Sequence, residues 1–374
     1  MRIGLITRRF DPDGGGTERD LTLTAAILAR AGHQVMIYAN EIRRGAQPWP
    51  VKMVRGPLPG RTLQVWWFAR KAAAEARRDG AELVLSFARV IGADILRSGG
   101  GAHASYIRAA AQWQGWAERF AMRLNPYHRV QMAIERAGFR HPHLQRAIAV
   151  SKLVTDDLVG SFDLPPERVV TVYNGVDCGT FKPALDSAER NALRQRLGLP
   201  DDARVVLFVG SGFGRKGLGF LIEAWKRLNG SPYLLVAGGD RAAKKYQRLV
   251  MRHGVGDRVR FLGRRDDVPE LMRTADAFAL PSLFEPFGNV ALEAMASGLP
   301  VLTTLRCGVA EVVPDELRSL VVADPTNVRE LAAKMQALIE APSALGETAR
   351  AAAEQFTWER HASELLALIE GRHG

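Results

Sequence analysis

Short apolar runs alternate with longer amphipathic stretches along most of the chain. "IGLIT" (residues 3–7) predicts a buried strand, and Glu18 to Arg30 predicts an amphipathic helix that ends at Gly32. Three further strand-like runs follow in the first half: "QVMIYA" (34–39), "ELVLSF" (82–87) and "RAIAVS" (146–151). Strands that alternate with helices in this way are typical of a doubly wound parallel sheet in an α/β fold.

The same alternation restarts after residue 200. The second set of strand-like runs is 204–210, 233–239, 258–263, 277–282 and 299–304. A helix is expected from about Leu218, between the first two of these runs. We therefore predict two Rossmann-like domains, 1–173 and 174–355, that face each other across a cleft. The linker is expected near 174–184, and a terminal helix at about 356–374 is expected to pack back on the first domain.

The composition of the chain limits the classes of partner and the cellular location that we expect. The 374 residues carry a net charge of +11, which indicates an acidic partner such as a nucleotide, a nucleic acid, an acidic lipid surface or a phosphorylated glycan. Two cysteines give no disulfide framework and no cysteine metal site. The chain opens directly on a strand and has no apolar run of membrane-spanning length, so we expect a cytoplasmic location.

Ligands of open α/β sheets bind at the carboxyl ends of the strands, so we expect the functional residues in the loops that follow strands. Gly14 to Gly16 lie between the first strand and a helix, where glycines allow close approach of a phosphate. An ordinary turn explains them equally well. The neighbouring Asp11-Pro12-Asp13 resembles an Asp-x-Asp metal motif, but such turns often carry Asp and Pro for local reasons. We therefore predict no metal site there.

The loop "GSGFGRKG" (210–217) follows the first strand of the second set. Its glycines match the spacing of a dinucleotide-binding fingerprint, but no Ser or Thr follows the lysine as in a Walker loop. Arg215 and Lys216 suggest a diphosphate that gains negative charge, as a leaving group does. The alternative is a pair of solvated loop cations.

The stretch "FEPFGNVALEAMASGLPVLTT" (284–304) places two carboxylates around a helix start. Asn289 is a suitable N-cap for a helix over 290–297, and Gly288 lies at its N-terminus, where free N–H groups suit an anion. Glu285 precedes the helix and Glu293 lies one turn inside it. A solvated glutamate beside a routine helix cap is the alternative interpretation.

His103 follows three glycines, Gly99 to Gly101, in the first half. A lone histidine is more often structural than catalytic. The glycines imply close packing against another group, so both interpretations stay open.

In this order and spacing, the loops resemble the retaining family 4 glycosyltransferases of GT-B fold. The resemblance covers essentially the whole chain and rests on Gly14 to Glu18, Ser211 to Gly217, Glu285-x7-Glu293 and Gly298 to Val301. Within the family, the chain is most similar to the lipopolysaccharide core heptose glucosyltransferases. The resemblance implies retaining transfer of a hexose, glucose from UDP-glucose, to an inner-core heptose. Another cell-surface glycan is the alternative acceptor.

The resemblance also implies roles for residues. Glu285 would hold the donor sugar, Glu293 the ribose, and His103 an oxocarbenium-like state, with Asp20 positioning the acceptor. No metal or cofactor is then needed, because cationic side chains neutralise the diphosphate. The implied donor-binding set is Gly15, Gly16, Arg215, Lys216, Phe287, Gly288, Asn289, Val290 and Glu293.

The sequence also fits two other classes of function. An NAD-dependent dehydrogenase would use the glycines of 210–217, with Asp240 as the ribose acid. It would leave Arg215, Lys216 and the two glutamates without roles. A nucleic-acid-binding protein would account for the basic charge, but the sequence contains no nucleic-acid-binding module.

Residues 106–139 form a basic, aromatic segment. Residues 101–150 carry seven arginines against two glutamates, which is +5 of the total +11. The apolar positions that share one face of a predicted helix are Trp113, Trp116, Phe120 and Leu124. Arg119 and Arg123 flank them, a pattern that suits an anionic membrane surface. Packing of the same stripe onto its own domain is the alternative.

Overall fold

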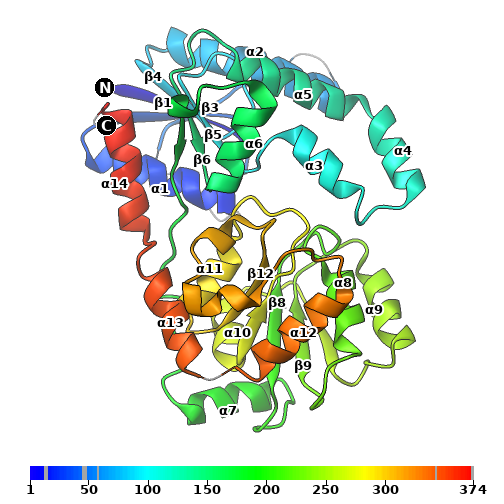
Figure 1. Ribbon diagram of the computed structural model, residues 1–374. Coiled ribbons are helices and arrows are strands. Elements are labelled where there is room, and N and C mark those ends of the chain that lie inside the picture. Colours follow the sequence, from blue (N-terminus) through cyan, green and yellow to red (C-terminus); the bar gives the residue numbers. More distant parts are fainter. Residues whose placement is uncertain (12–15, 44–48, 57–58, 342, 372–374) are drawn as a thin grey trace. The chain divides into compact units, whose positions relative to one another are not determined.

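The computed structural model describes residues 1–11, 16–43, 49–56, 59–341 and 343–371. The chain divides into two compact α/β units (Figure 1). The first comprises Met1–Tyr173 together with the residues from Glu359 onward, and the second comprises Asn174–Trp358. The C-terminal helix therefore belongs to the first unit.

The first unit is built on a seven-stranded sheet whose paired strands all run parallel. The strand order is β3-β2-β1-β4-β5-β6-β7. The strands are β1 (Arg2–Phe10), β2 (Gln34–Ile42), β3 (Val51–Met53), β4 (Leu83–Ser86), β5 (Ile95–Ser98), β6 (Arg146–Ala149) and β7 (Val169–Thr171). Because β2 lies on one side of β1 and β4 on the other, the strand order reverses at β1, which is where ligands bind in such sheets.

Helices surround this sheet and complete its core. They are α1 (Gly16–Arg30), α2 (Arg61–Arg78), α3 (His103–Ala110), α4 (Trp116–Leu124), α5 (Pro126–Phe139), α6 (Lys152–Phe162) and α14 (Trp358–Ile369), with a 3-10 turn, η1, at Pro166–Arg168. Leu365, Leu368 and Ile369 of α14 are buried in the same apolar cluster as Leu21 and Leu28 of α1. Their spacing of three and four residues is that of one helix face, which explains why α14 packs on this unit.

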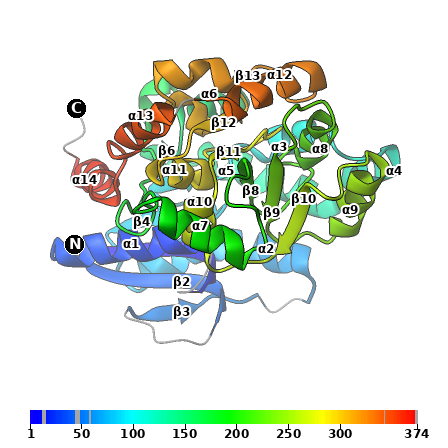
Figure 2. The same ribbon diagram turned by 90° about the horizontal axis from the view of Figure 1, so that it is seen from below.

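The second unit has a six-stranded parallel sheet of order β10-β9-β8-β11-β12-β13. Figure 2 shows β8, β9 and β10 side by side. The strands are β8 (Val205–Val209), β9 (Tyr233–Ala237), β10 (Val259–Gly263), β11 (Ala277–Ala279), β12 (Val301–Thr304) and β13 (Val321–Val322). The helices are α7 (Ser187–Arg196), α8 (Leu218–Trp225), α9 (Ala243–Arg252), α10 (Val268–Thr274), α11 (Asn289–Ala296), α12 (Val328–Ile339) and α13 (Ala344–Ala353), with 3-10 turns η2 (Gly308–Glu311) and η3 (Asp315–Leu320).

The predicted fold class, two Rossmann-like α/β domains, is confirmed. Four short strands, β3, β5, β7 and β13, were not predicted. One predicted helix is wrong in extent: Trp113 lies in a turn before α4, so it does not share a helix with Trp116. None of the helices in the described ranges has the length and apolar character required to cross a membrane.

Candidate active site

In the second unit, the loop 210–217 follows β8 and is held tightly by backbone packing. Gly217 has φ +76°, and a Cβ there would lie 2.0 Å from the carbonyl oxygen of Pro281. At Gly210, a Cβ would lie 2.4 Å from Cε of Lys216. Glycine is therefore required at Gly217, whose close approach to Pro281 fixes the loop against the segment that follows β11, and it is favoured at Gly210 by a φ of +145°.

Asp240, which follows β9, supports the same loop. Its carboxylate accepts a hydrogen bond from the Phe213 backbone N–H (2.7 Å) and another from the Ala242 N–H (2.7 Å). The dehydrogenase alternative assigned this carboxylate to a ribose. In the structure it fixes the loop instead.

Arg215, Lys216 and Glu285 come together although they lie in separate loops. Oε2 of Glu285 accepts a hydrogen bond from the Arg215 NH1 group (2.7 Å) and from Nζ of Lys216 (2.9 Å). The Leu283 N–H also donates to the Arg215 carbonyl (2.8 Å), which joins the loops through the backbone. The two loops follow β8 and β11, which are neighbours in the sheet, so their proximity follows from the topology.

The charges in this cluster decide the protonation of Glu285. Burial alone would raise its pKa, but the positive charges and hydrogen bonds of Lys216 and Arg215 hold the pKa below the ordinary glutamate value. Glu285 is therefore a carboxylate at neutral pH. Arg215 has five N–H donors, and within the described residues only its NH1 group has acceptors, Glu285 and the Phe284 carbonyl.

Gly288 rather than Asn289 caps α11, so the predicted N-cap is wrong by one residue. Gly288 has φ +95°, and a Cβ there would lie 2.8 Å from Sγ of Cys307. Asn289 is the first helical residue, and its side-chain oxygen accepts a hydrogen bond from Nδ2 of Asn174 (2.7 Å). The helix extends over Asn289–Ala296 instead of 290–297.

The other predicted donor-binding residues of this region differ in exposure. Phe287 is buried, and its carbonyl accepts hydrogen bonds from the Val309 N–H (2.7 Å) and the Cys307 thiol (3.2 Å). Val290 and Glu293 are half-buried on α11. The start of α11 presents the positive end of the helix dipole.

Asp20 in the first unit is buried in a cluster of charged and polar groups. Its side chain is only 4% exposed, and Oδ2 lies 2.6 Å from the Arg97 guanidinium. Its Oδ1 faces Nε2 of His361 at 3.4 Å, while Nδ1 of His361 lies 2.8 Å from the Tyr173 carbonyl. Asp20 therefore joins α1, β5 and α14, and its role in positioning the acceptor stays a prediction.

His103 is the first residue of α3 and is buried among polar groups. Its Nε2 lies 2.8 Å from Nδ1 of His128, and its backbone N–H donates to Glu135 (2.9 Å). Arg89 also donates to Glu135. Burial, the charge of Arg89 and the proximity of His128 lower the pKa of His103 to about 4, so its ring is neutral at pH 7.

The partners of His103 were not found from the sequence. His128 and Glu135 lie on α5, and Arg89 follows β4. No motif links these positions along the chain. Asn125, which caps α5, and Pro126, its first residue, were local signals that a helix begins near His128.

Gly15 lies outside the described residues, as does Asp13 of the candidate metal motif, and Gly16 begins α1. Asp11 faces Arg43 (3.3 Å) and Arg9 (3.7 Å). Within the described residues, no group of three or more His, Cys, Asp or Glu side chains is arranged to hold a metal ion.

Comparison with known proteins identifies the family. Residues 189–355 match the model of glycosyl transferases group 1, and residues 14–180 match that of glycosyltransferase family 4. The chain is 30% identical to the lipopolysaccharide glucosyltransferase WaaG of Escherichia coli over 85% of this chain and 84% of WaaG. A crystal structure of WaaG superposes with a TM-score of 0.82 at 26% identity, covering 99% of this chain and all of that one.

Other relatives differ in what they act on. A D-inositol 3-phosphate glycosyltransferase of Salinispora arenicola is 37% identical over 59% of this chain, which spans about half (53%) of that relative. The Anabaena protein HepE, solved with UDP and glucose, shares the fold at a TM-score of 0.73 and 21% identity, covering 99% of this chain and all of HepE. By matching both family models and WaaG along most of its length, the chain belongs to the group 1, family 4 glycosyltransferases of GT-B fold.

Proposed function

We propose that the protein transfers a hexose, with retention of anomeric configuration, from a UDP-sugar to a glycolipid acceptor. Glucose is the proposed sugar, and an inner-core heptose of lipopolysaccharide is the proposed acceptor. The similarity to WaaG over most of both chains supports this choice, and the UDP and glucose bound by HepE support the donor class. Family membership removes the reason to consider a dehydrogenase.

The observation that carries the proposal is the contact of Glu285 with Arg215 and Lys216. Two cations and one carboxylate leave a net positive charge at the strand ends of the second unit. A diphosphate gains negative charge as its glycosidic bond breaks, and preorganised cations stabilise it most at that moment. Nε and NH2 of Arg215 have no acceptor among the described residues, so they can serve the diphosphate.

The start of α11 supports the sugar and ribose parts of the donor. Glu285 would accept hydrogen bonds from hydroxyls of the donor sugar, and Glu293 from those of the ribose. The first N–H groups of a helix lack intrahelical acceptors, so those from Gly288 to Val290 would bind phosphate or sugar oxygens. The backbone N–H of Gly16, at the start of α1, is a further candidate to bind a phosphate oxygen.

His103 would contribute as a neutral imidazole. Its lowered pKa keeps positive charge away from an oxocarbenium-like sugar. Retention would follow from attack on the face that the phosphate leaves, with the departing phosphate oxygen taking the acceptor proton. No metal is part of this proposal, because Arg215 and Lys216 supply the positive charge.

The exposed residues of α4 support the proposal that the acceptor lies in a membrane. Trp116, Phe120 and Leu124 are 77%, 60% and 66% exposed, and α4 has no buried residue. Arg119 and Arg123 lie on the same helix and are exposed. A basic helix with exposed aromatic residues suits an anionic membrane surface, so we propose peripheral binding to the inner face of the cytoplasmic membrane.

Incubation with a panel of nucleotide sugars, followed by detection of the released nucleoside diphosphate, tests the donor. Release of UDP from UDP-glucose above all other donors is expected. Product NMR with a heptose glycoside then gives the acceptor and the anomeric configuration. An inverted product would contradict the retaining mechanism, and turnover with only another glycan, such as an inositol phosphate, would replace the acceptor.

A further inference from the structure

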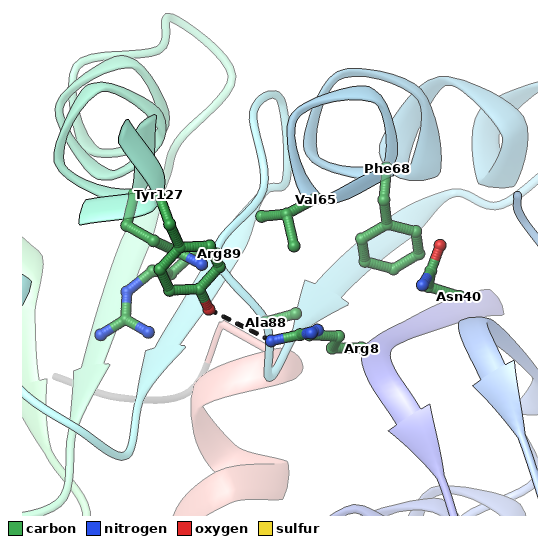
Figure 3. A pocket seen from close by; sticks show the side chains of 8 residues that line it. Arg8, Asn40, Val65, Phe68, Ala88, Arg89 and Tyr127 are labelled. Atoms are coloured by element: carbon green, nitrogen blue, oxygen red, sulfur yellow. Dashed lines mark hydrogen bonds between the residues drawn. The ribbon is translucent and has the colours of Figure 1, made fainter. Parts of the chain in front are cut away.

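A cationic pocket in the first unit is lined by none of the residues assigned to the donor above (Figure 3). A cavity of about 110 Å³ is lined by residues that include Arg8, Asn40, Arg89, Tyr127 and Gln131. A wider hollow of about 600 Å³ shares Arg8 and Asn40 with it. This second volume lies in the range of sites for small molecules.

The position of this pocket in the sheet is that of a ligand site. Arg8 comes from the end of β1, Asn40 from the end of β2, and Arg89 from the segment after β4. The strand order reverses at β1, so the pocket lies at the switch point of the sheet. The cluster around Glu285 occupies the corresponding place in the second sheet, after β8 and β11.

The charges of the pocket are unbalanced. Arg8, Arg55 and Arg61 line the wider hollow, and Glu41 is its only lining carboxylate within the described residues. None of these three arginines forms an ion pair with a described carboxylate, whereas Arg89 is paired with Glu135. Three guanidinium groups around one hollow attract an anion.

Two of these arginines converge on one phenol. Arg8 NH1 donates to the Tyr127 hydroxyl (3.2 Å), and the Arg61 guanidinium lies 4.6 Å from the centre of the Tyr127 ring. Burial would raise the pKa of Tyr127, but the charges of Arg8 and Arg61 and a hydrogen bond from Gln131 lower it. The start of α2 at Arg61 and the start of α5 at Pro126 add positive helix ends to the same wall.

Buried amide oxygens give the pocket a second chemical character. Oδ1 of Asn40 and Oε1 of Gln131 are buried without a hydrogen-bond partner in the structure, and the two residues are only 7% and 4% exposed. An unpartnered buried oxygen is costly unless water or a ligand satisfies it. These oxygens can accept hydrogen bonds from hydroxyl groups. An oxyanion has no hydrogen to donate, so it cannot satisfy them by itself.

We propose that this pocket binds an acidic sugar of the acceptor, with the oxyanion, phosphate or carboxylate, on Arg8 and Arg61 and the sugar hydroxyls on Asn40 and Gln131. The proposal rests on the proposed function, which defines the acceptor. It goes beyond that function by making the enzyme specific for glycans that carry a negative charge near the attacking hydroxyl.

Steady-state kinetics with three matched acceptors tests this specificity. The acceptors are the same heptose glycoside with a phosphate, a carboxylate or a hydroxyl on the neighbouring position. We expect Arg8→Gln and Arg61→Gln to raise KM for the charged acceptors roughly 10- to 100-fold, the range for a hydrogen bond to a charged group. KM for the neutral acceptor and for UDP-glucose should change less than about twofold. The neutral acceptor offers no charge to Arg8 or Arg61, and UDP-glucose is assigned to other residues. The larger effect, on phosphate or on carboxylate, identifies the source of the charge.

Arg70→Gln is the matched control, because Arg70 lies on α2 with Arg61, is exposed and does not line the pocket. It should leave all three KM values unchanged. An equal rise in KM for charged and neutral acceptors in the Arg8 and Arg61 variants would overturn the proposal.

Direct binding separates this proposal from the proposed function. Glucose 6-phosphate, glucuronate, glucose and glycerol 3-phosphate are titrated into the full chain and followed by NMR. Binding of an acidic sugar that Arg61→Gln abolishes and Arg70→Gln retains supports the pocket even if no nucleotide sugar is turned over. Equal binding of glycerol 3-phosphate and glucose 6-phosphate would assign the site to lipid headgroups and contradict the role of the buried amides, as would no binding at all.

Discussion

The carboxylate of Glu285 accepts a hydrogen bond from Nζ of Lys216 at 2.9 Å, and both side chains are largely buried. The pair links the loop after β8 to the segment before α11, and the same carboxylate oxygen also contacts Arg215. A single carboxylate therefore holds in place two cations that are proposed to face a diphosphate.

Glu285→Gln and Lys216→Met should each lower turnover by roughly 10²–10³-fold, the loss seen when one preorganised stabilising group is removed. Gln and Met keep the side-chain length, so the packing over Gly210 is retained. UDP release is the measurement, with circular dichroism to verify the fold. Lys244→Met on the exposed face of α9 is the control and should retain full turnover. Near wild-type turnover in either site variant would refute the role of that residue.

The same pair predicts a pH effect on stability. The pKa of Glu285 is lower in the folded protein than its ordinary value of 4.5. The stabilisation is therefore present above about pH 4.5 and is lost as pH falls through the lower folded pKa. Thermal unfolding of wild type and Glu285→Gln between pH 7 and pH 3 is the measurement. The wild type should lose melting temperature more steeply below pH 4.5, and parallel curves would contradict the prediction.

His103 predicts a pH effect of the same sign in a higher range. Its pKa of about 4 lies below the ordinary 6.5, so the unfolded chain binds a proton first as pH falls. Stability from the neutral ring is complete above pH 6.5 and declines towards pH 4. The melting temperature of the wild type should fall more than that of His103→Gln over this interval. A histidine NMR titration with a midpoint near 6.5 for His103 would show that the ring is not buried as described.

Gly288→Ala should destabilise the second unit. A side chain at φ +95° is strained by about 1–3 kcal/mol, and its Cβ would meet Sγ of Cys307 at 2.8 Å. Equilibrium denaturation measures the loss. Gly160→Ala in α6 has open space around it and should stabilise by about 0.5–1 kcal/mol, as alanine does within a helix. Equal effects of the two substitutions would argue against the described cap.

The sequence predicted the part of this site that follows from the order of strands in the sheet. Arg215 and Glu285 were expected in one site because each follows a strand, and the order β9-β8-β11 does make their loops neighbours. Their direct ion pair could not be predicted, because strand order leaves the side-chain orientations open. The cap at Gly288 was missed because asparagine is a preferred N-cap residue, which favoured Asn289. In the structure the N-cap is Gly288, which has a positive φ.

The first unit shows where sequence patterns fail. The partners of Asp20, Arg97 and His361, could not be predicted, because they come from β5 and α14 and no pattern along the chain links these segments. Asn40 and Gln131 belong to apolar stretches and look like ordinary polar interruptions of them. Only the folded chain shows that both face one cavity with Arg8.

The exposed surface of α4 predicts binding to anionic membranes. Its exposed apolar residues and the flanking Arg119 and Arg123 should bring the protein to anionic vesicles at low ionic strength, with each arginine near the surface adding ~1 kcal/mol. Salt screens this attraction, so flotation should weaken as ionic strength rises. Arg119→Glu with Arg123→Glu should reduce flotation, while UDP binding, which is assigned to the second unit, should persist. Arg248→Glu with Arg252→Glu on α9 is the matched control: the same charge change at the same spacing, at exposed positions, should leave flotation much less affected. Equal flotation with neutral and anionic vesicles, or equal losses in the two double variants, would show that overall charge and not the surface of α4 governs binding.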